Sequence, residues 1–123
     1  MSKDLNRPQN EIATTIRVQN DAFRKAGWLP ALGVDGRKVH TSGIADYSPE
    51  VIADIWRQVA AFDAFAPEND PHGEHDFGAF DHPAAGRVFW KIDYYDPSYE
   101  FGADDPADPS TKRVLTVMLA EEY

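Results

Sequence analysis

Metal-ligating side chains are concentrated in one stretch of the sequence, NDPHGEHDFGAFDH, which begins at Asn69. His72 and His75 lie three residues apart, and Asp76 follows directly. Imidazole and carboxylate groups are common ligands of zinc, manganese and iron. The candidate metal ligands are therefore His72, His75, Asp76 and, further along, His82.

The spacing of these residues fits no standard metal motif. It is neither the HExxH pattern of zinc enzymes nor the twelve-residue EF-hand loop of calcium proteins. Carboxylates in such a loop also cap turns by accepting backbone N–H groups, which explains Asp70 and Asp76 without a metal. We therefore predict no metal and no cofactor. A metal-dependent enzyme that uses His72, His75 and Asp76 is the alternative function.

The sequence contains no pattern for nucleophilic catalysis or for phosphate binding. It has no cysteine, which excludes disulfides, thiolate metal sites and cysteine nucleophiles. No serine lies in a GxSxG turn, and there is neither a GxGxxG nor a GxxxxGKS/T phosphate loop. We therefore predict no catalytic residue.

Acidic residues dominate the charge and are concentrated in one segment. The formal net charge is −9, from 21 acidic and 12 basic residues. Residues 63–110 hold twelve of the carboxylates and only two of the cations, a formal charge of −10, so the rest of the chain is close to neutral. Such a surface repels phosphates and argues against direct binding of nucleic acid or of an anionic membrane. It either keeps the protein dissolved or faces a basic partner.

Tyrosines interleaved with acids mark the part of this segment that best fits a partner. Tyr94, Tyr95 and Tyr99 lie between acidic residues, and tyrosine is enriched at the energetic centres of protein interfaces. On the strand expected there, Lys91, Asp93 and Tyr95 share a face, which a cross-strand ion pair covered by an aromatic ring also explains. The predicted partner-binding residues are Asp70, Glu74, Asp76, Asp93, Tyr95, Asp96, Tyr99, Glu100, Asp104, Asp105 and Asp108.

Hydrophobic periodicity and capping residues predict six elements. Two helices are expected, the first over residues 11–26 with Asn10 as its cap, and the second from Ser48 and Pro49 to about residue 65. The last strand is apolar on both faces, which predicts a central position in a sheet. The expected strands cover residues 37–44, 77–80, 87–96 and 113–120.

Helices early in the chain and strands late in it indicate an α+β fold. We predict an antiparallel sheet of about four strands with two helices packed on one face, in a single domain over residues 1–123 with a flexible arm at residues 1–8. Trp56 and Trp90 are expected in the core, and Trp28 on the surface. No apolar run approaches the roughly 20 residues of a membrane span, and no signal-peptide core is present, which predicts a soluble, cytoplasmic protein.

Several motifs resemble those of a known bacterial family. They are QNDAFR from Gln19, NDPHGEHDFG from Asn69, FWKIDYYD from Phe89, DPADP from Asp105 and RVLTVMLAEEY from Arg113. They cover nearly the whole chain, which resembles a family of short, mainly alphaproteobacterial proteins known only as a domain of unknown function. The resemblance implies a setting on plasmids and other mobile elements, near antirestriction and plasmid-maintenance genes, and it implies no chemistry.

Charge segregation and this setting together predict an inhibitor rather than an enzyme. We expect a small acidic binding protein, encoded by a mobile element, that occupies a basic groove of a host protein complex which targets nucleic acid. Duplex DNA carries one negative charge per roughly 1.7 Å of its axis, so a compact array of carboxylates can compete for such a groove. The expected class is an anti-CRISPR or antirestriction protein that acts by mimicking nucleic acid. A partner of plasmid replication or partition proteins is a third interpretation.

Overall fold

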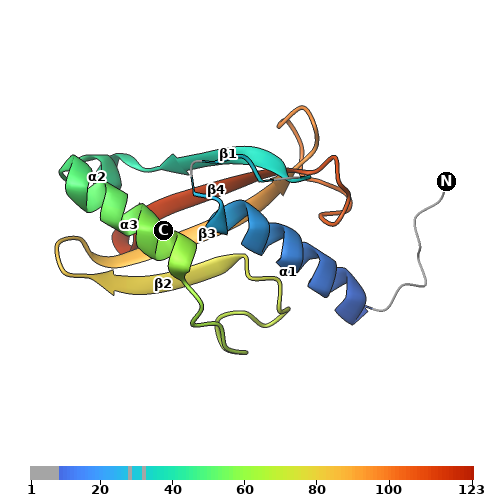
Figure 1. Cartoon of the computed structure of the whole chain (residues 1–123), viewed down its shortest axis with the longest axis horizontal. Helices are drawn as coiled ribbons and strands as arrows, with labels where there is room; N and C mark the ends of the chain where they lie inside the picture. Colours follow the sequence, from blue (N-terminus) through green and yellow to red (C-terminus); the bar gives the residue numbers. More distant parts are fainter. Residues whose placement is uncertain (1–8, 28, 32) are drawn as a thin grey trace.

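The computed structural model describes residues 9–27, 29–31 and 33–123 (Figure 1). Its centre is one sheet of four strands in the order β1–β4–β3–β2. The strands are β1 (Asp35–His40), β2 (Phe77–His82), β3 (Gly86–Tyr95) and β4 (Lys112–Leu119). The helices are α1 (Gln9–Lys25), α2 (Ser42–Ala45), α3 (Pro49–Ala61) and the 3-10 helix η1 (Ala120–Glu122). These helices and strands confirm the prediction of an α+β fold with a four-stranded sheet.

One strand pair differs from the predicted antiparallel sheet. β2 pairs with β3, and β3 with β4, in antiparallel fashion, whereas β1 pairs with β4 in parallel. A parallel pair needs a long crossover connection, which α2, α3 and the β2–β3 hairpin supply between β1 and β4. The prediction of a wholly antiparallel sheet is therefore wrong at β1. The last strand, β4, lies between β1 and β3, which confirms its predicted central position.

Helix α1 follows the predicted periodicity but not the predicted start. It already includes Asn10, so the capping role predicted for this residue is wrong. It ends two residues before Gly27, whose φ of 62° is a conformation that glycine adopts at little cost. Its buried residues are Ile16, Asn20, Phe23 and Arg24, so two polar side chains lie among the apolar ones.

Helix α3 begins as predicted and ends early. The Ser48 hydroxyl accepts the Val51 N–H at 3.3 Å, and Pro49 occupies the first turn. The helix ends four residues before the predicted end, because Phe62 has an extended backbone with a ψ of 133°. The Phe62 ring then meets the Trp90 ring edge to face, with 5.7 Å between the ring centroids.

A short helix replaces the end of the strand predicted over residues 37–44. α2 follows Thr41, and its residue Ile44 is fully buried. Its start is held from the far end of the chain, because the Glu122 carboxylate accepts the Thr41 hydroxyl at 2.6 Å and the Gly43 N–H at 3.1 Å. Strand β1 therefore stops at His40, where these contacts begin.

Core side chains come from alternate positions of the two central strands. The buried positions of β3 and β4 join side chains of α1, α2 and α3 in one cluster, and Figure 1 draws α1 and α3 in front of the strands. Trp90 is fully buried and Trp56 is 8% exposed, which confirms both predictions, whereas Trp28 and the arm at residues 1–8 lie outside the described residues. Within the described chain, no helix has the length and apolar character that crossing a membrane requires. The cluster consists of Phe23, Ile44, Ile55, Trp56, Val59, Phe62, Val88, Trp90, Ile92, Leu115 and Val117.

Candidate functional site

The first candidate region is the connection from β3 to β4, residues 96–111, hereafter the acidic loop. It holds five carboxylates and no lysine or arginine. Three of its aspartates shape the loop, because each accepts the backbone N–H two residues further on, as aspartates in turns do. These contacts run from Asp96 to Ser98, from Asp105 to Ala107 and from Asp108 to Ser110, at 3.1, 3.1 and 2.8 Å.

Four of the five carboxylates surround one hollow of about 180 Å³, lined by Asp96, Asp104, Asp105 and Asp108 with four uncharged residues. No lysine or arginine is among the lining residues that the structure describes. The Ser98 hydroxyl donates to Asp96 at 2.7 Å and, with nearby backbone N–H groups, holds the pKa of that carboxyl below its usual value. The hollow therefore concentrates negative charge at a fixed place.

The second half of the acidic loop is fastened to the body of the protein. The Pro106 carbonyl accepts a hydrogen bond from the buried Arg113 at 3.0 Å. The Ala107 carbonyl accepts one from Gln19 of α1 at 2.9 Å, and Ala107 itself is only 6% exposed. These contacts hold the carboxylates on either side of them in place.

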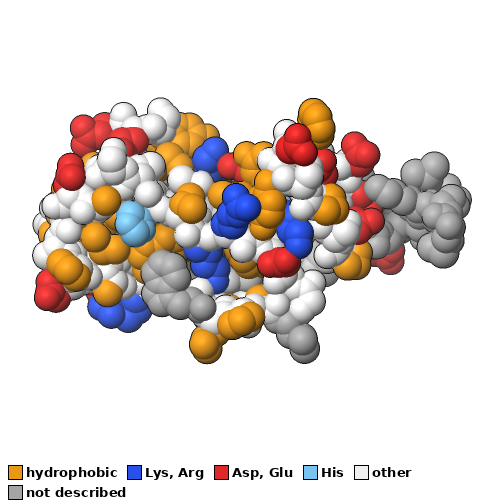
Figure 2. Space-filling model, turned by 90° about the horizontal axis from the view of Figure 1, so that it is seen from above, with side chains coloured by type: hydrophobic (Ala, Val, Ile, Leu, Met, Phe, Trp, Pro, Cys, Tyr) orange, Lys and Arg blue, Asp and Glu red, His pale blue; other side chains and the backbone are white. Residues whose placement is uncertain are grey.

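The first half of the acidic loop is held by an aromatic contact. The Tyr99 backbone has a φ of 62°, and the guanidinium carbon of Arg37 on β1 lies 3.9 Å from the centre of the Tyr99 ring. Glu100 and Asp104 are exposed. Figure 2 shows acidic side chains towards both ends of the molecule, including the end where the acidic loop leaves the sheet, and basic side chains between them.

Asp93 and Tyr95 lie on the sheet face that points away from the core, just before the acidic loop. Lys91 Nζ is 2.9 Å from Asp93 Oδ2, and about two-fifths of each side chain is exposed, 40% and 42%. Both residues belong to β3, so the ion pair runs along one strand and the predicted cross-strand pair is wrong. Tyr95 is half-buried beside them.

The second candidate region precedes β2 and comprises residues 69–76, hereafter the histidine loop. Its centre is Asp70, which is only 9% exposed. Asp70 Oδ1 accepts the N–H groups of Glu74 at 3.1 Å and of His75 at 3.2 Å. Gly73, which lies between Asp70 and these two residues, turns the chain with a φ of 67°. Asp70 therefore acts as the turn cap that the metal-free explanation predicts.

His75 lies between two carboxylates. Its Nδ1 is 2.9 Å from Asp21 Oδ1 on α1, and its Nε2 is 3.6 Å from Asp70 Oδ2. The ring stacks on Phe65 with 3.7 Å between the centroids, and the backbone has a φ of 55°, which residues other than glycine rarely adopt. Asp21 also pairs with the buried Arg24 at 3.1 Å. These contacts fasten the histidine loop to α1.

Two further acids of the histidine loop are half-buried, and this raises the pKa of both. Burial raises the pKa of Glu74, and the neighbouring Asp76 carboxylate adds to the effect. Burial raises the pKa of Asp76 in the same way, reinforced by Asp70. Asn20 donates to the Glu74 carbonyl at 2.9 Å and to the Tyr94 hydroxyl at 2.8 Å. The histidine loop is thus a packed polar cluster.

The structure separates His82 from the other three predicted metal ligands, which remain in the histidine loop. His82 lies at the other end of β2, where its Nε2 is 2.7 Å from Asp54 Oδ2 of α3 and its Nδ1 accepts a backbone N–H. His72 is exposed, whereas His75 is held between Asp21 and Asp70. In the described part of the chain, no group of three or more His, Cys, Asp or Glu residues is arranged to hold a metal ion. The metal hypothesis gains no support from this geometry.

A buried polar network links the two candidate loops, and the sequence analysis missed it. Asn20, which contacts Glu74, also accepts a hydrogen bond from Arg113 Nε at 2.7 Å, and Arg113 in turn reaches Pro106 of the acidic loop. A signal for this network was present in the QNDAFR motif. Asn20 follows Ile16 by four positions on α1, so a polar residue occupies the stripe that faces the core.

The eleven predicted partner-binding residues therefore lie in three places. The acidic loop adjoins the sheet face directly, because Tyr95 continues into Asp96. The histidine loop is connected to the acidic loop through the buried network and to β3 through the Ile92 N–H, which donates to the Asp76 carbonyl at 2.8 Å. The acidic loop holds Asp96, Tyr99, Glu100, Asp104, Asp105 and Asp108, the sheet face Asp93 and Tyr95, and the histidine loop Asp70, Glu74 and Asp76.

Comparison with known proteins relates the chain to one described family. The model of a family described as "Protein of unknown function (DUF3768)" matches residues 40–122. This span contains both candidate loops and strands β2 to β4, and it leaves out α1 with the QNDAFR motif. No curated protein and no solved structure matches the chain.

Proposed function

The chain belongs to the DUF3768 family of proteins of unknown function, and we propose from its geometry that it is a binding protein rather than an enzyme. The acidic loop, with Asp93 and Tyr95 beside it, is the surface that enters a basic groove of a partner protein. The observation that carries the proposal is the hollow lined by four aspartates, with no lysine or arginine among its described lining residues.

Order within the acidic loop favours this role. Three of its four aspartates make turn contacts, and Pro106 and Ala107 are hydrogen-bonded to Arg113 and Gln19. A surface that is already ordered loses less conformational entropy on association than a mobile one. The charges therefore meet a partner in a fixed pattern.

A protein that normally holds nucleic acid is the partner that fits this surface. Its groove is basic because it neutralises phosphates, which follow one another at roughly 1.7 Å per charge along duplex DNA. Opposite charges also accelerate the encounter of two proteins. The resemblance to mobile-element proteins suggests a CRISPR effector or a restriction enzyme of the host, which the protein inhibits by mimicking nucleic acid.

The proposal narrows the set of contact residues. Asp70 is buried, and Glu74 and Asp76 are half-buried in contact with α1 and β3, so we assign these three acids to the scaffold. Two tyrosines beside the carboxylates supply apolar area to the interface. The proposed contact residues are Asp93, Tyr95, Asp96, Tyr99, Glu100, Asp104, Asp105 and Asp108.

Replacing Asp104, Asp105 and Asp108 together with asparagine tests the proposal. Asparagine keeps a side-chain oxygen that caps turns and removes three charges. We expect the rate of association with a purified CRISPR effector or restriction endonuclease to fall about tenfold or more at low salt. The dependence of this rate on salt should also flatten, because exposed charges are screened beyond about 8 Å at physiological ionic strength.

A matched control removes the same net charge elsewhere. Glu11, Asp46 and Glu121 are exposed and lie outside the acidic loop, so their joint replacement by the corresponding amides should change the rate much less. Equal slowing by the two triple variants would overturn the acidic loop as the contact surface. Failure of the native protein to bind either class of enzyme would overturn the choice of partner.

A further inference from the structure

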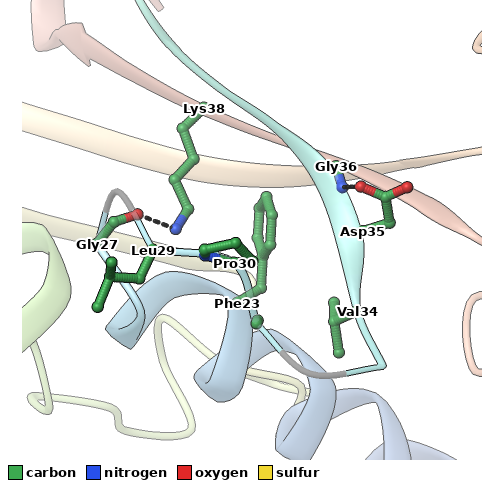
Figure 3. A pocket seen from close by; sticks show the side chains of 9 residues that line it. Phe23, Gly27, Leu29, Pro30, Val34, Asp35, Gly36 and Lys38 are labelled. Carbon is green, nitrogen blue, oxygen red and sulfur yellow. Dashed lines mark hydrogen bonds between the residues drawn. The ribbon is translucent and has the colours of Figure 1, made fainter.

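We infer that a pocket at the C-terminal end of α1 binds a small carboxylate with an apolar body. The pocket lies between the end of α1, residues 29–31 and β1 (Figure 3). Its volume is about 330 Å³, which is within the range of small-molecule sites. Lys38 is the only cation among its described lining residues, and its apolar lining residues are Phe23, Leu29, Pro30, Ala31 and Val34.

Lys38 places an ammonium group beside these apolar side chains. Its side chain extends from β1 towards the end of α1, where the ammonium group donates to the Gly27 carbonyl (Figure 3). The ammonium nitrogen also lies 4.7 Å from the centre of the Phe23 ring. An ammonium group has three N–H donors, so two remain for a ligand. Burial lowers the pKa of Lys38, and no carboxylate among the described residues opposes this effect.

The acid that lines the pocket does not neutralise Lys38. Asp35 lies on the opposite face of β1, and Figure 3 shows its side chain turned away from Lys38. Its carboxylate accepts the Gly36 N–H at 2.9 Å and pairs with Lys112. The positive charge inside the pocket is therefore left for a ligand to compensate.

Gly36 allows the pocket to have an aromatic wall close to the strand. A Cβ atom at this position would lie 2.9 Å from Phe23 Cζ and 2.0 Å from the Arg113 carbonyl oxygen. Only a residue without a side chain lets the Phe23 ring and β4 approach β1 so closely. Phe23 is only 5% exposed, so its ring is held in place by the core cluster next to the ammonium group.

These features select one chemical class of ligand. The carboxylate of such a ligand forms charge-assisted hydrogen bonds with the two remaining N–H donors of Lys38. Its aromatic or branched apolar part packs against the apolar lining side chains and removes them from water. The end of α1 carries partial negative charge, so the attraction for an anion must come from Lys38 itself. None of the described lining residues belongs to the acidic loop, so this site does not depend on the proposed function.

Titration calorimetry of the full chain with phenylacetate and with its neutral amide, phenylacetamide, tests the inference. We expect the acid to bind more tightly than the amide. The Lys38→Met variant has an uncharged side chain of similar length and should bind phenylacetate at least about tenfold more weakly. Its affinity for phenylacetamide should not change. The matched control, Lys25→Met, removes an exposed cation from the last turn of α1 and should bind phenylacetate like the native protein.

Nuclear magnetic resonance of the native protein tests the site even if Lys38→Met fails to fold. Phenylacetate should shift the amide signals of Gly27, Val34 and Gly36 and leave those of the acidic loop unchanged. Equal affinity for the acid and the amide would overturn the inference. So would an unchanged phenylacetate affinity in a folded Lys38→Met variant, shifts confined to other parts of the chain, or no binding of phenylacetate.

Discussion

The acidic loop and the histidine loop are both rich in carboxylates, and they use them in opposite ways. The Ser98 hydroxyl and backbone N–H groups lower the pKa of Asp96, whereas burial raises the pKa of Glu74 and of Asp76. The difference arises because α1 packs on the histidine loop, through Asp21 among others, and leaves the rim of the acidic loop open. A local density of acids therefore indicates a display surface only where no helix covers it.

The largest expected effect comes from the carboxylate at the centre of the histidine loop. Asp70→Ala leaves the N–H groups of Glu74 and His75 without their acceptor. We expect the free energy of unfolding to fall by about 2–4 kcal/mol, because each unsatisfied buried group costs roughly 1–3 kcal/mol. Urea denaturation at neutral pH measures this change.

The matched variant in the other loop is Asp104→Ala. Asp104 is exposed, so the free energy of unfolding should change by no more than about 0.5 kcal/mol. Similar losses of stability in Asp70→Ala and Asp104→Ala would contradict the assignment of the histidine loop to the scaffold and of the acidic loop to the contact surface.

The pH dependence of stability should differ in sign between the two loops. Because the pKa of Glu74 is raised in the folded state, the folded protein binds more protons there than the unfolded chain. Its contribution to stability is full below the unfolded pKa and is lost as pH rises through the folded pKa. Glu74→Gln should therefore stabilise the protein at pH 7 relative to the native chain, and this gain should shrink as pH falls below the folded pKa.

Asp96 should behave in the opposite way, because its pKa is lowered in the folded state. Its contribution is full above the unfolded pKa and is lost as pH falls through the folded pKa. Asp96→Asn should therefore destabilise the protein at pH 7 and match the native chain in strong acid. Thermal melts of Glu74→Gln, Asp96→Asn and the native chain between pH 7 and strong acid measure how each stability difference changes with pH. Differences of the same sign at pH 7 would contradict the comparison of the two loops.

The smallest expected effect is the response to zinc. If the histidine loop is a scaffold, adding zinc to protein purified without an affinity tag should leave the melting temperature unchanged, because only a ligand that binds the native state raises it. His72 is exposed, so His72→Ala is a safe control. A rise in melting temperature that this variant abolishes would restore the metal-dependent enzyme as the leading function.

Elements with local signals at their ends were predictable. Ser48 and Pro49 mark the start of α3, and the alternation of apolar residues marks β3 and β4. The parallel pairing of β1 was not predictable, because its partner begins at Lys112, 77 residues after Asp35. The replacement of the end of the first strand by α2 depends on Glu122, which is as distant in the chain. No local pattern reports such contacts.

For the candidate site, the sequence by itself determined where the charge is and which residues form turns. These properties depend on residue type and on neighbours within a few positions, as the caps from Asp70, Asp96 and Asp108 show. Only the tertiary structure decided which acids are covered. That choice depends on α1, whose Asn20 and Asp21 reach the histidine loop from more than 50 residues away. Burial then raises the pKa of Glu74 and of Asp76, because removal from water penalises the charged form.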